Sequence, residues 1–177
     1  MTPEIAALGL VLAAIALVFV STAATGASPL PTSAAVRDAM LAALPARIDG
    51  PIYELGSGWG GLAAALARRY PAAPVTGFEV SALPWAVSKL RSVFGGPPNL
   101  TIRLRDFHRA SLADAALVVC FLTPPAMEKL KSKLESELGP GAMVLSNTFA
   151  FRDWQPAEVR TVPDPHRSRV YLYRIDG

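Results

Sequence analysis

The chain has 177 residues, a length that fits one domain with a short appendage. Apolar residues make up 51% of it, and 17 basic against 14 acidic side chains leave a formal net charge of +3. This small, scattered excess gives no argument for nucleic-acid binding. The single cysteine excludes an internal disulfide, and with only two histidines we expect no metal cluster.

The N-terminus is the most apolar part of the chain. No charged or polar side chain occurs from Ile5 to Val20, and residues 5–24 would form about 30 Å of helix. This length predicts a membrane anchor over residues 1–27. A cleaved signal peptide is the alternative, because "STAATGAS" offers small residues, but the basic n-region of a signal peptide is missing.

The orientation of this anchor follows from the basic residues. The first of them, Arg37, comes after the apolar run, and none precedes it. The positive-inside rule therefore favours a single-pass protein with its catalytic domain in the cytoplasm.

Residues 28–177 are predicted to form one α/β domain. After the linker "TGASPLPTSAAV", Thr32 or Ser33 can cap a helix that ends near Leu44. Strand and helix patterns then alternate, which indicates a mostly parallel sheet built from βαβ units. The strands are expected within 51–55, 74–80, 100–106, 114–122 and 139–151, and the helices within 61–70, 83–94 and 124–138. Two alternating segments, 157–162 and 168–175, predict an antiparallel hairpin at the C-terminus.

A glycine loop, "ELGSGWGG", follows the first predicted strand at residues 54–61. Gly56, Gly58 and Gly61 fit the dinucleotide fingerprint at the position where a Rossmann-like fold requires it. Glu79 ends the second strand, 23 residues after Gly56, and is placed to accept hydrogen bonds from ribose hydroxyls. The loop therefore predicts adenosine binding, either as NAD or as S-adenosylmethionine.

Two further carboxylates favour S-adenosylmethionine. Glu54 precedes the loop, where it would repel a pyrophosphate but suit a ligand ammonium. Asp106 ends the third strand, where it can accept a hydrogen bond from an adenine amino group. Strand-end carboxylates also cap helices, so each acid has a purely structural alternative.

These motifs resemble the class I S-adenosylmethionine-dependent methyltransferases. Within this class, the chain resembles the family of ATP synthase c-subunit and adenine nucleotide translocase lysine methyltransferases with their bacterial relatives. The matching segments are an N-terminal membrane segment, "PLPTSAAV", "ELGSGWGG", "GFEVSALPW", "RDF", "FLTPP" and "FAFRDWQP". Trp59 departs from the eukaryotic pattern, which commonly has an aspartate there.

The resemblance implies a set of site residues. Gly56, Ser57, Gly58, Gly60 and Glu79 would line the cofactor, Asp106 and Phe107 would flank the adenine, and Thr32 would lie close to the active site. Because the sulfonium methyl is already activated and a dry pocket favours the neutral amine, no fixed catalytic base is required, and we identify no catalytic residue. The aromatic set Phe149, Phe151 and Trp154 would either form a rim for a lysine or cover the sheet.

The residues in and after the fourth strand argue against nucleic-acid bases as methyl acceptors. "TPPA" lacks the amide or acid and the aromatic residue that adenine-N6 enzymes carry there, and Cys120 lies inside an apolar strand rather than at a nucleophile position. The sequence thus predicts a membrane-anchored protein-lysine N-methyltransferase that acts on a membrane protein. A small-molecule or lipid amine methyltransferase and a catalytically silent cofactor-binding assembly factor remain alternatives.

Overall fold

The computed structural model describes residues 2–25 and 31–176, and linker residues 26–30 lie outside this part. In chain order the helices and strands are α1 (Pro3–Thr25), α2 (Ala34–Ala43), β1 (Ile52–Leu55), α3 (Gly61–Arg69), β2 (Val75–Glu79), α4 (Ala82–Val93), β3 (Leu100–Leu104), the 3-10 turn η1 (Phe107–Arg109), β4 (Leu117–Cys120), α5 (Pro124–Glu137), β5 (Met143–Asn147), β6 (Glu158–Thr161) and β7 (Arg169–Arg174).

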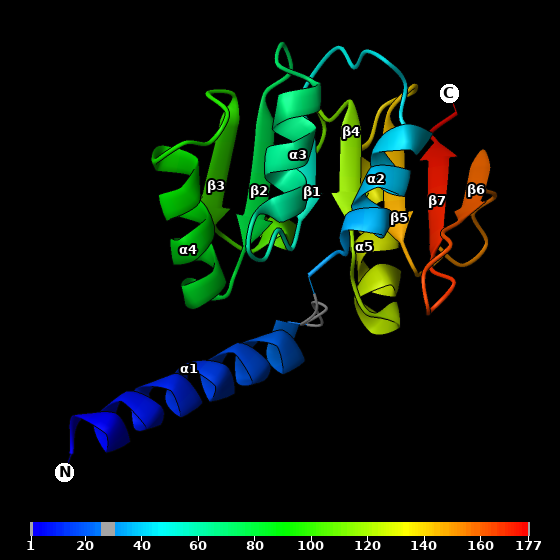
Figure 1. Ribbon diagram of the computed structural model, residues 1–177. Helices are drawn as coiled ribbons and strands as arrows, with labels where there is room; N and C mark the ends of the chain where they lie inside the picture. Colours follow the sequence, from blue (N-terminus) through cyan, green and yellow to red (C-terminus); the bar gives the residue numbers. More distant parts are fainter. Residues whose placement is uncertain (1, 26–30, 177) are drawn as a thin grey trace.

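The strands form one sheet in the order β3-β2-β1-β4-β5-β7-β6 (Figure 1). Neighbours among β1 to β5 pair in parallel, whereas β7 is antiparallel to both β5 and β6. The predicted fold class, a Rossmann-like sheet with a C-terminal antiparallel hairpin, is confirmed. The second hairpin strand is the one that joins the parallel part, because β7 lies between β5 and β6.

Two hydrophobic cores lie on opposite faces of the sheet. On one face, α2 and α3 pack through side chains such as Met40 and Leu66, and α4 contributes Trp85. On the other face, α5 packs through Leu130 and Leu134 together with two irregular segments. Figure 1 shows α2, α3 and α4 on one side and α5 on the other. Central strand β4 is covered on both faces, so all four of its residues are buried, as the continuous apolar run predicts.

Local sequence explains where several helices begin and end. Ser33, rather than Thr32, caps α2, since its Oγ accepts a hydrogen bond from the backbone N–H of Val36 at 3.3 Å. Two prolines occupy the first turn of α5, where their missing N–H groups would have no helical partner. Cys120 is a buried core residue, and burial raises the pKa of its thiol to about 12.

The N-terminal helix α1 lies outside the layers around the sheet (Figure 1). It confirms the helix predicted over residues 5–24. Among the residues that the structure describes in full, no helix is both long and apolar enough to cross a membrane, so the predicted transmembrane helix is not confirmed. The membrane anchor over 1–27, the domain boundary at 28 and the cytoplasmic orientation stay predictions from the sequence.

Candidate active site

The glycine loop turns sharply between β1 and α3. Gly56, Gly58 and Gly60 have φ angles of 75°, 51° and 76°, in the left-handed region that glycine adopts at little cost. A Cβ at Gly60 would lie 2.8 Å from the Cβ of Ser88, so the loop also needs glycine there to pack against α4. A Cβ at Gly58 would meet nothing within 4 Å. Gly58 therefore faces open space at the carboxyl end of the sheet, where such folds bind ligands.

Glu79 holds the loop in this conformation. Its Oε2 accepts a hydrogen bond from the N–H of Gly58 at 2.7 Å, and its Oε1 accepts from the N–H groups of Val80 and Ser81 at 2.9 and 2.7 Å. A carboxylate has about four lone-pair sites, and three are thus used. Glu79 can bind one ribose hydroxyl in this arrangement, whereas the predicted acceptance from both ribose hydroxyls would require a backbone hydrogen bond to be given up.

Glu54 is a buried carboxylate under the N-terminus of α3. Burial raises its pKa to about 8, a hydrogen bond from the backbone of Ala63 opposes this rise, and the charge of Glu79 adds to it. Its Oε2 is buried and has no hydrogen-bond partner among the described residues. An acceptor oxygen left in this state is costly unless a ligand or water completes it, and a ligand ammonium would suit it.

Asp106 and Phe107 follow β3 at the same end of the sheet. The backbone N–H of Arg105 donates to the carbonyl of Glu79 at 2.8 Å, which fixes this segment beside the end of β2. Asp106 caps η1 by accepting from the N–H of His108 at 2.9 Å and remains partly exposed. The ring of Phe107 is buried in the core and lies 4.4 Å, centroid to centroid, from that of His108. Asp106 is therefore both a cap and an available acceptor.

Most of the predicted site residues lie together at the carboxyl end of the sheet. Glu54, the loop and Glu79 meet at the ends of β1 and β2, and Asp106 lies next to them at the end of β3. Thr32 lies just before α2, and no hydrogen bond among the described residues joins it to the loop. Its role near the active site stays a prediction. The side chain of Ser57 is buried, and a Cβ added to Gly77 would lie 2.8 Å from its Cβ, so Ser57 packs against β2.

Sequence reasoning missed several residues at this end of the sheet. The Nε1 of Trp85 on α4 is buried and has no hydrogen-bond partner among the described residues. After β5, Thr148 has a φ of 67° although it is β-branched, and its Oγ1 donates to the Oδ1 of buried Asn147 at 3.0 Å. Such a backbone persists only where its surroundings hold it, and it is found most often at functional sites. The pattern "SNT" carries no signal for it.

The aromatic set after β5 covers the sheet instead of forming a rim. Phe151 is buried, with its ring centroid 4.8 Å from that of Trp154 and 5.4 Å from that of Tyr173. The backbone N–H of Phe151 donates to the Tyr173 hydroxyl at 3.0 Å. Together with Phe149, these rings pack into the core on the α5 face. Of the two roles predicted from the sequence, the structure supports the one in which these aromatic side chains cover the sheet.

These observations fit S-adenosylmethionine. The partnerless oxygen of Glu54 suits the ammonium of its methionine part, and the open space at Gly58 admits a ligand close to the backbone. The remaining acceptor site on Glu79 and the exposed part of Asp106 suit the ribose and the adenine. Among the described residues no group of three or more histidine, cysteine, aspartate or glutamate side chains could hold a metal ion.

Known proteins support this assignment. The sequence profile of the family described as "ANTKMT methyltransferase domain" matches residues 54–158, more than half of the chain. A protein-lysine N-methyltransferase of Saccharolobus islandicus is 32% identical over 149 residues, which cover 82% of this chain and 92% of that protein. The adenine nucleotide translocase lysine N-methyltransferase of Mus musculus is 32% identical over 72% of this chain, although the match spans only 55% of the mouse protein.

The fold has a close counterpart among solved structures. A structure of an RNA methyltransferase from Salinibacter ruber, in complex with S-adenosyl-L-homocysteine, superposes with a TM-score of 0.75 at 27% identity, over 83% of this chain and 94% of that one. The fold and site therefore define an S-adenosylmethionine-dependent methyltransferase of class I. Within that class, the chain belongs to the ANTKMT methyltransferase family.

Proposed function

We propose that the protein transfers a methyl group from S-adenosylmethionine to the side-chain amine of a lysine in a protein substrate. The similarity to the Saccharolobus protein-lysine N-methyltransferase carries this proposal, because it extends over 82% of this chain and 92% of that protein. Two mouse relatives, named for adenine nucleotide translocase and for the ATP synthase c-subunit, are likewise lysine N-methyltransferases. The share of the mouse proteins that is matched is smaller, so their particular substrates do not transfer to this chain.

The chemistry asks little of the protein beyond binding and alignment. S-adenosylmethionine supplies a methyl group that its sulfonium already activates. The neutral amine nitrogen forms the new bond to the methyl carbon, the carbon–sulfur bond breaks with its electron pair left on sulfur, and the resulting ammonium releases one proton to solvent water. The chain must place the amine in line at about 3–3.5 Å. It must also accept the amine in its neutral form, which a site with little water favours.

The residues present meet these requirements without a dedicated base. Glu54 would fix the ammonium end of the cofactor, and the remaining acceptor site of Glu79 would bind the ribose of the adenosine end. Asn147 and the strained Thr148 lie at the end of β5, two strands from β1, where an acceptor approaching the methyl group would pass. Their positions qualify them to orient the amine.

The acceptor class is tested by transfer of a labelled methyl group. The purified full-length chain and S-adenosylmethionine with a tritiated methyl group would be incubated with a lysate from the source cells, and with its protein, lipid and RNA fractions separately. A labelled protein that yields methyl-lysine on hydrolysis is the expected result. Label confined to lipid would favour a lipid amine methyltransferase, and label in RNA would align the chain with its Salinibacter counterpart. Cofactor binding without methyl transfer would favour the catalytically silent cofactor-binding assembly factor.

A further inference from the structure

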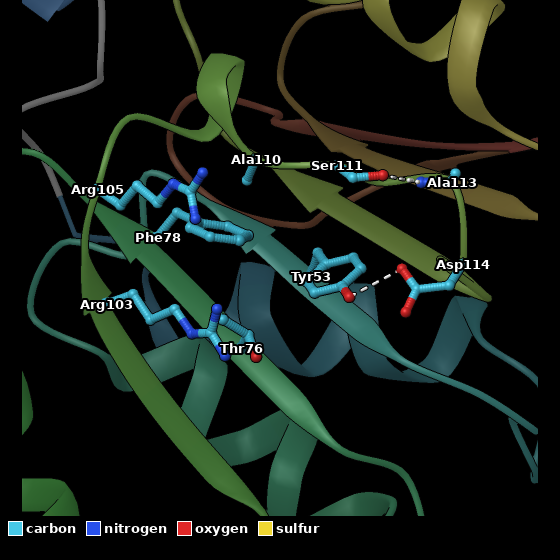
Figure 2. A pocket seen from close by; sticks show the side chains of 9 residues that line it. All are labelled: Tyr53, Thr76, Phe78, Arg103, Arg105, Ala110, Ser111, Ala113 and Asp114. Carbon is cyan, nitrogen blue, oxygen red and sulfur yellow. Dashed lines mark hydrogen bonds between the residues drawn. The ribbon is translucent and has the colours of Figure 1, made fainter.

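The connection between β3 and β4 leaves one part of the sheet without a covering helix. Helices α3, α4 and α5 each link two consecutive strands, whereas residues 105–116 contain only the three-residue turn η1. On the face opposite α3 and α4 this leaves a pocket of about 380 Å³, within the range of sites for small molecules. Figure 2 shows its lining, which consists of Tyr53, Thr76, Phe78, Arg103, Arg105, Ala110, Ser111, Ala113 and Asp114.

The floor of this pocket is aromatic. Tyr53 on β1 and Phe78 on β2 project from the same face of the sheet, with ring centroids 5.7 Å apart and planes tilted by 37°. Phe78 is buried, whereas Tyr53 is partly exposed. The exposed part of the Tyr53 ring offers a surface on which a flat apolar group can pack, and the ring of Phe78 supports it from the core. The floor therefore selects for a planar body.

One wall of the pocket is cationic. Arg103 lies on β3, Arg105 directly follows this strand, and both side chains line the pocket. Both side chains are exposed, and Figure 2 shows them reaching across Thr76 and Phe78. Arg105 donates to the carbonyl of Arg109, but neither guanidinium forms an ion pair with any carboxylate in the part of the chain that the structure describes. This wall holds two positive charges without a bound counter-charge.

The opposite wall keeps a negative charge away from the arginines. The hydroxyl of Tyr53 donates to the Oδ1 of Asp114 at 2.9 Å (Figure 2). Burial, and after it the hydrogen bond to Asp114, raises the pKa of Tyr53 to about 12, so the hydroxyl keeps its proton and the contact persists. The Oγ of Ser111 accepts from the N–H of Ala113 at 3.3 Å, which leaves its own O–H as a donor. An anionic group would be repelled by Asp114 and directed toward β3.

We propose that this pocket binds a small phosphate monoester with a flat apolar body, the phosphate lying between Arg103 and Arg105 and the body packing on the partly exposed ring of Tyr53. Guanidinium groups match phosphate oxygens through paired, charge-assisted hydrogen bonds. Two of them match the roughly two negative charges that a phosphate monoester carries at pH 7. A carboxylate would neutralise only one of these charges. The pocket lies on the face opposite α3 and α4, so it is a second site, separate from the glycine loop.

Phenyl phosphate is the probe for this site, since it has a planar ring and a dianionic head. Calorimetry at pH 7.5 on the full-length protein, with and without saturating S-adenosylhomocysteine, is expected to show one site that the second ligand does not block. Benzoate, a monoanion, should bind at least tenfold more weakly, and benzyl alcohol should show no binding. Inorganic phosphate, which lacks the ring, should also bind at least tenfold more weakly than phenyl phosphate.

Substitutions in the cationic wall locate the site. Arg103→Gln and Arg105→Gln should each weaken phenyl phosphate binding at least tenfold, because each removes a charged donor. Arg91→Gln is the matched control, since Arg91 is also exposed but lies on α4, outside the pocket. Tyr53→Phe keeps the ring and should change the affinity less than threefold.

Three results would overturn the proposal: no binding of phenyl phosphate at millimolar concentration, equal binding of benzoate, or parent-like affinity in both arginine variants. Unchanged thermal unfolding of these surface variants would show that a lost affinity is not a lost fold. None of these readouts depends on methyl transfer, so failure here and failure of the proposed lysine activity can be told apart.

Discussion

The carboxylate of Glu79 and the amide of Gly58 are joined by a hydrogen bond of 2.7 Å that ties the end of β2 to the middle of the glycine loop. Two segments that are 21 residues apart are thereby held as one surface. The loop is thus shaped before any ligand arrives, and its shape depends on a side chain that also offers an acceptor to that ligand.

A side chain at Gly58 should block the cofactor. Gly58→Arg is expected to abolish binding of S-adenosylmethionine in calorimetry, because the new side chain must enter the open space at the loop. Gly141→Arg is the matched control. Gly141 also has a positive φ, 84°, and open space at its Cβ, but it lies at the turn before β5. Both variants should lose about 1–2 kcal/mol of stability from the strained backbone, and equal cofactor affinity in the two would exclude the loop as the site.

Removal of the Glu79 carboxylate should affect binding and folding together. Glu79→Ala leaves three backbone N–H groups without their acceptor, so we expect a lower free energy of unfolding by about 1–3 kcal/mol. Cofactor affinity should fall by about the same amount, measured by calorimetry on the fraction that remains folded. Glu158→Ala, on the partly exposed edge strand β6, should change neither quantity much. An unchanged dissociation constant for Glu79→Ala would mean that this acid only supports the loop.

The buried Glu54 should make stability depend on pH in an unusual direction. Its pKa is raised in the folded protein from 4.5 to about 8. Between these two pH values the Glu54 carboxyl is therefore ionised in the unfolded state and protonated in the folded state. The unfolded state then binds fewer protons than the folded one, and stability falls as the pH rises from about 4.5 to 8. Glu54→Gln should remove this slope and raise Tm at pH 7.5 by roughly 2–4 °C per kcal/mol recovered, as measured by calorimetric unfolding scans at several pH values.

The same group predicts a proton linkage to cofactor binding. A ligand ammonium beside Glu54 would favour the ionised carboxylate, so binding at pH 7 should release close to one proton. Calorimetric titrations in buffers with different ionisation enthalpies measure this number. Glu54→Gln should reduce it toward zero and also weaken binding. If the parent protein takes up or releases no proton, the ammonium is held elsewhere.

Phe151 should matter for stability more than for the substrate. Phe151→Ala is expected to lower the free energy of unfolding by about 3–5 kcal/mol, since it opens a cavity in the core beside Tyr173. Phe94→Ala, at the exposed C-terminal end of α4, should cost far less. Denaturant unfolding checks both. A small loss of unfolding free energy for Phe151→Ala, together with a large rise in the KM for the protein substrate, would instead support a lysine-binding role for the aromatic set.

Much of the architecture could be predicted because it depends on local patterns. The alternation of strands and helices and the position of the glycine loop follow from periodicity and from turn residues within a few positions of each other. The buried strand β4 and the core position of Cys120 follow from the continuous apolar run that contains them. The strand-end acids were found because parallel strands bring their carboxyl ends to one edge of the sheet.

What could not be predicted depends on contacts between distant segments. The sequence does not show that the oxygens of Glu79 are already used by the backbone, nor that Ser57 packs against Gly77. It also does not show which way Phe151 faces, because both readings place an aromatic residue after β5. The pocket between Tyr53 and Asp114, 61 residues apart, exists only once the sheet has formed.

Strand β3 forms one edge of the sheet, with α4 on one face and the pocket on the other. With so little cover, its amides should exchange with solvent faster than those of β4, which is enclosed by neighbours on every side. The hydrogen bond from the N–H of Arg105 to the carbonyl of Glu79 links this edge to the cofactor loop. Local opening of β3 would therefore also release Asp106, and bound cofactor should slow exchange along the whole edge. The lifetime of this edge would then help to determine how readily the cofactor and its spent product enter and leave.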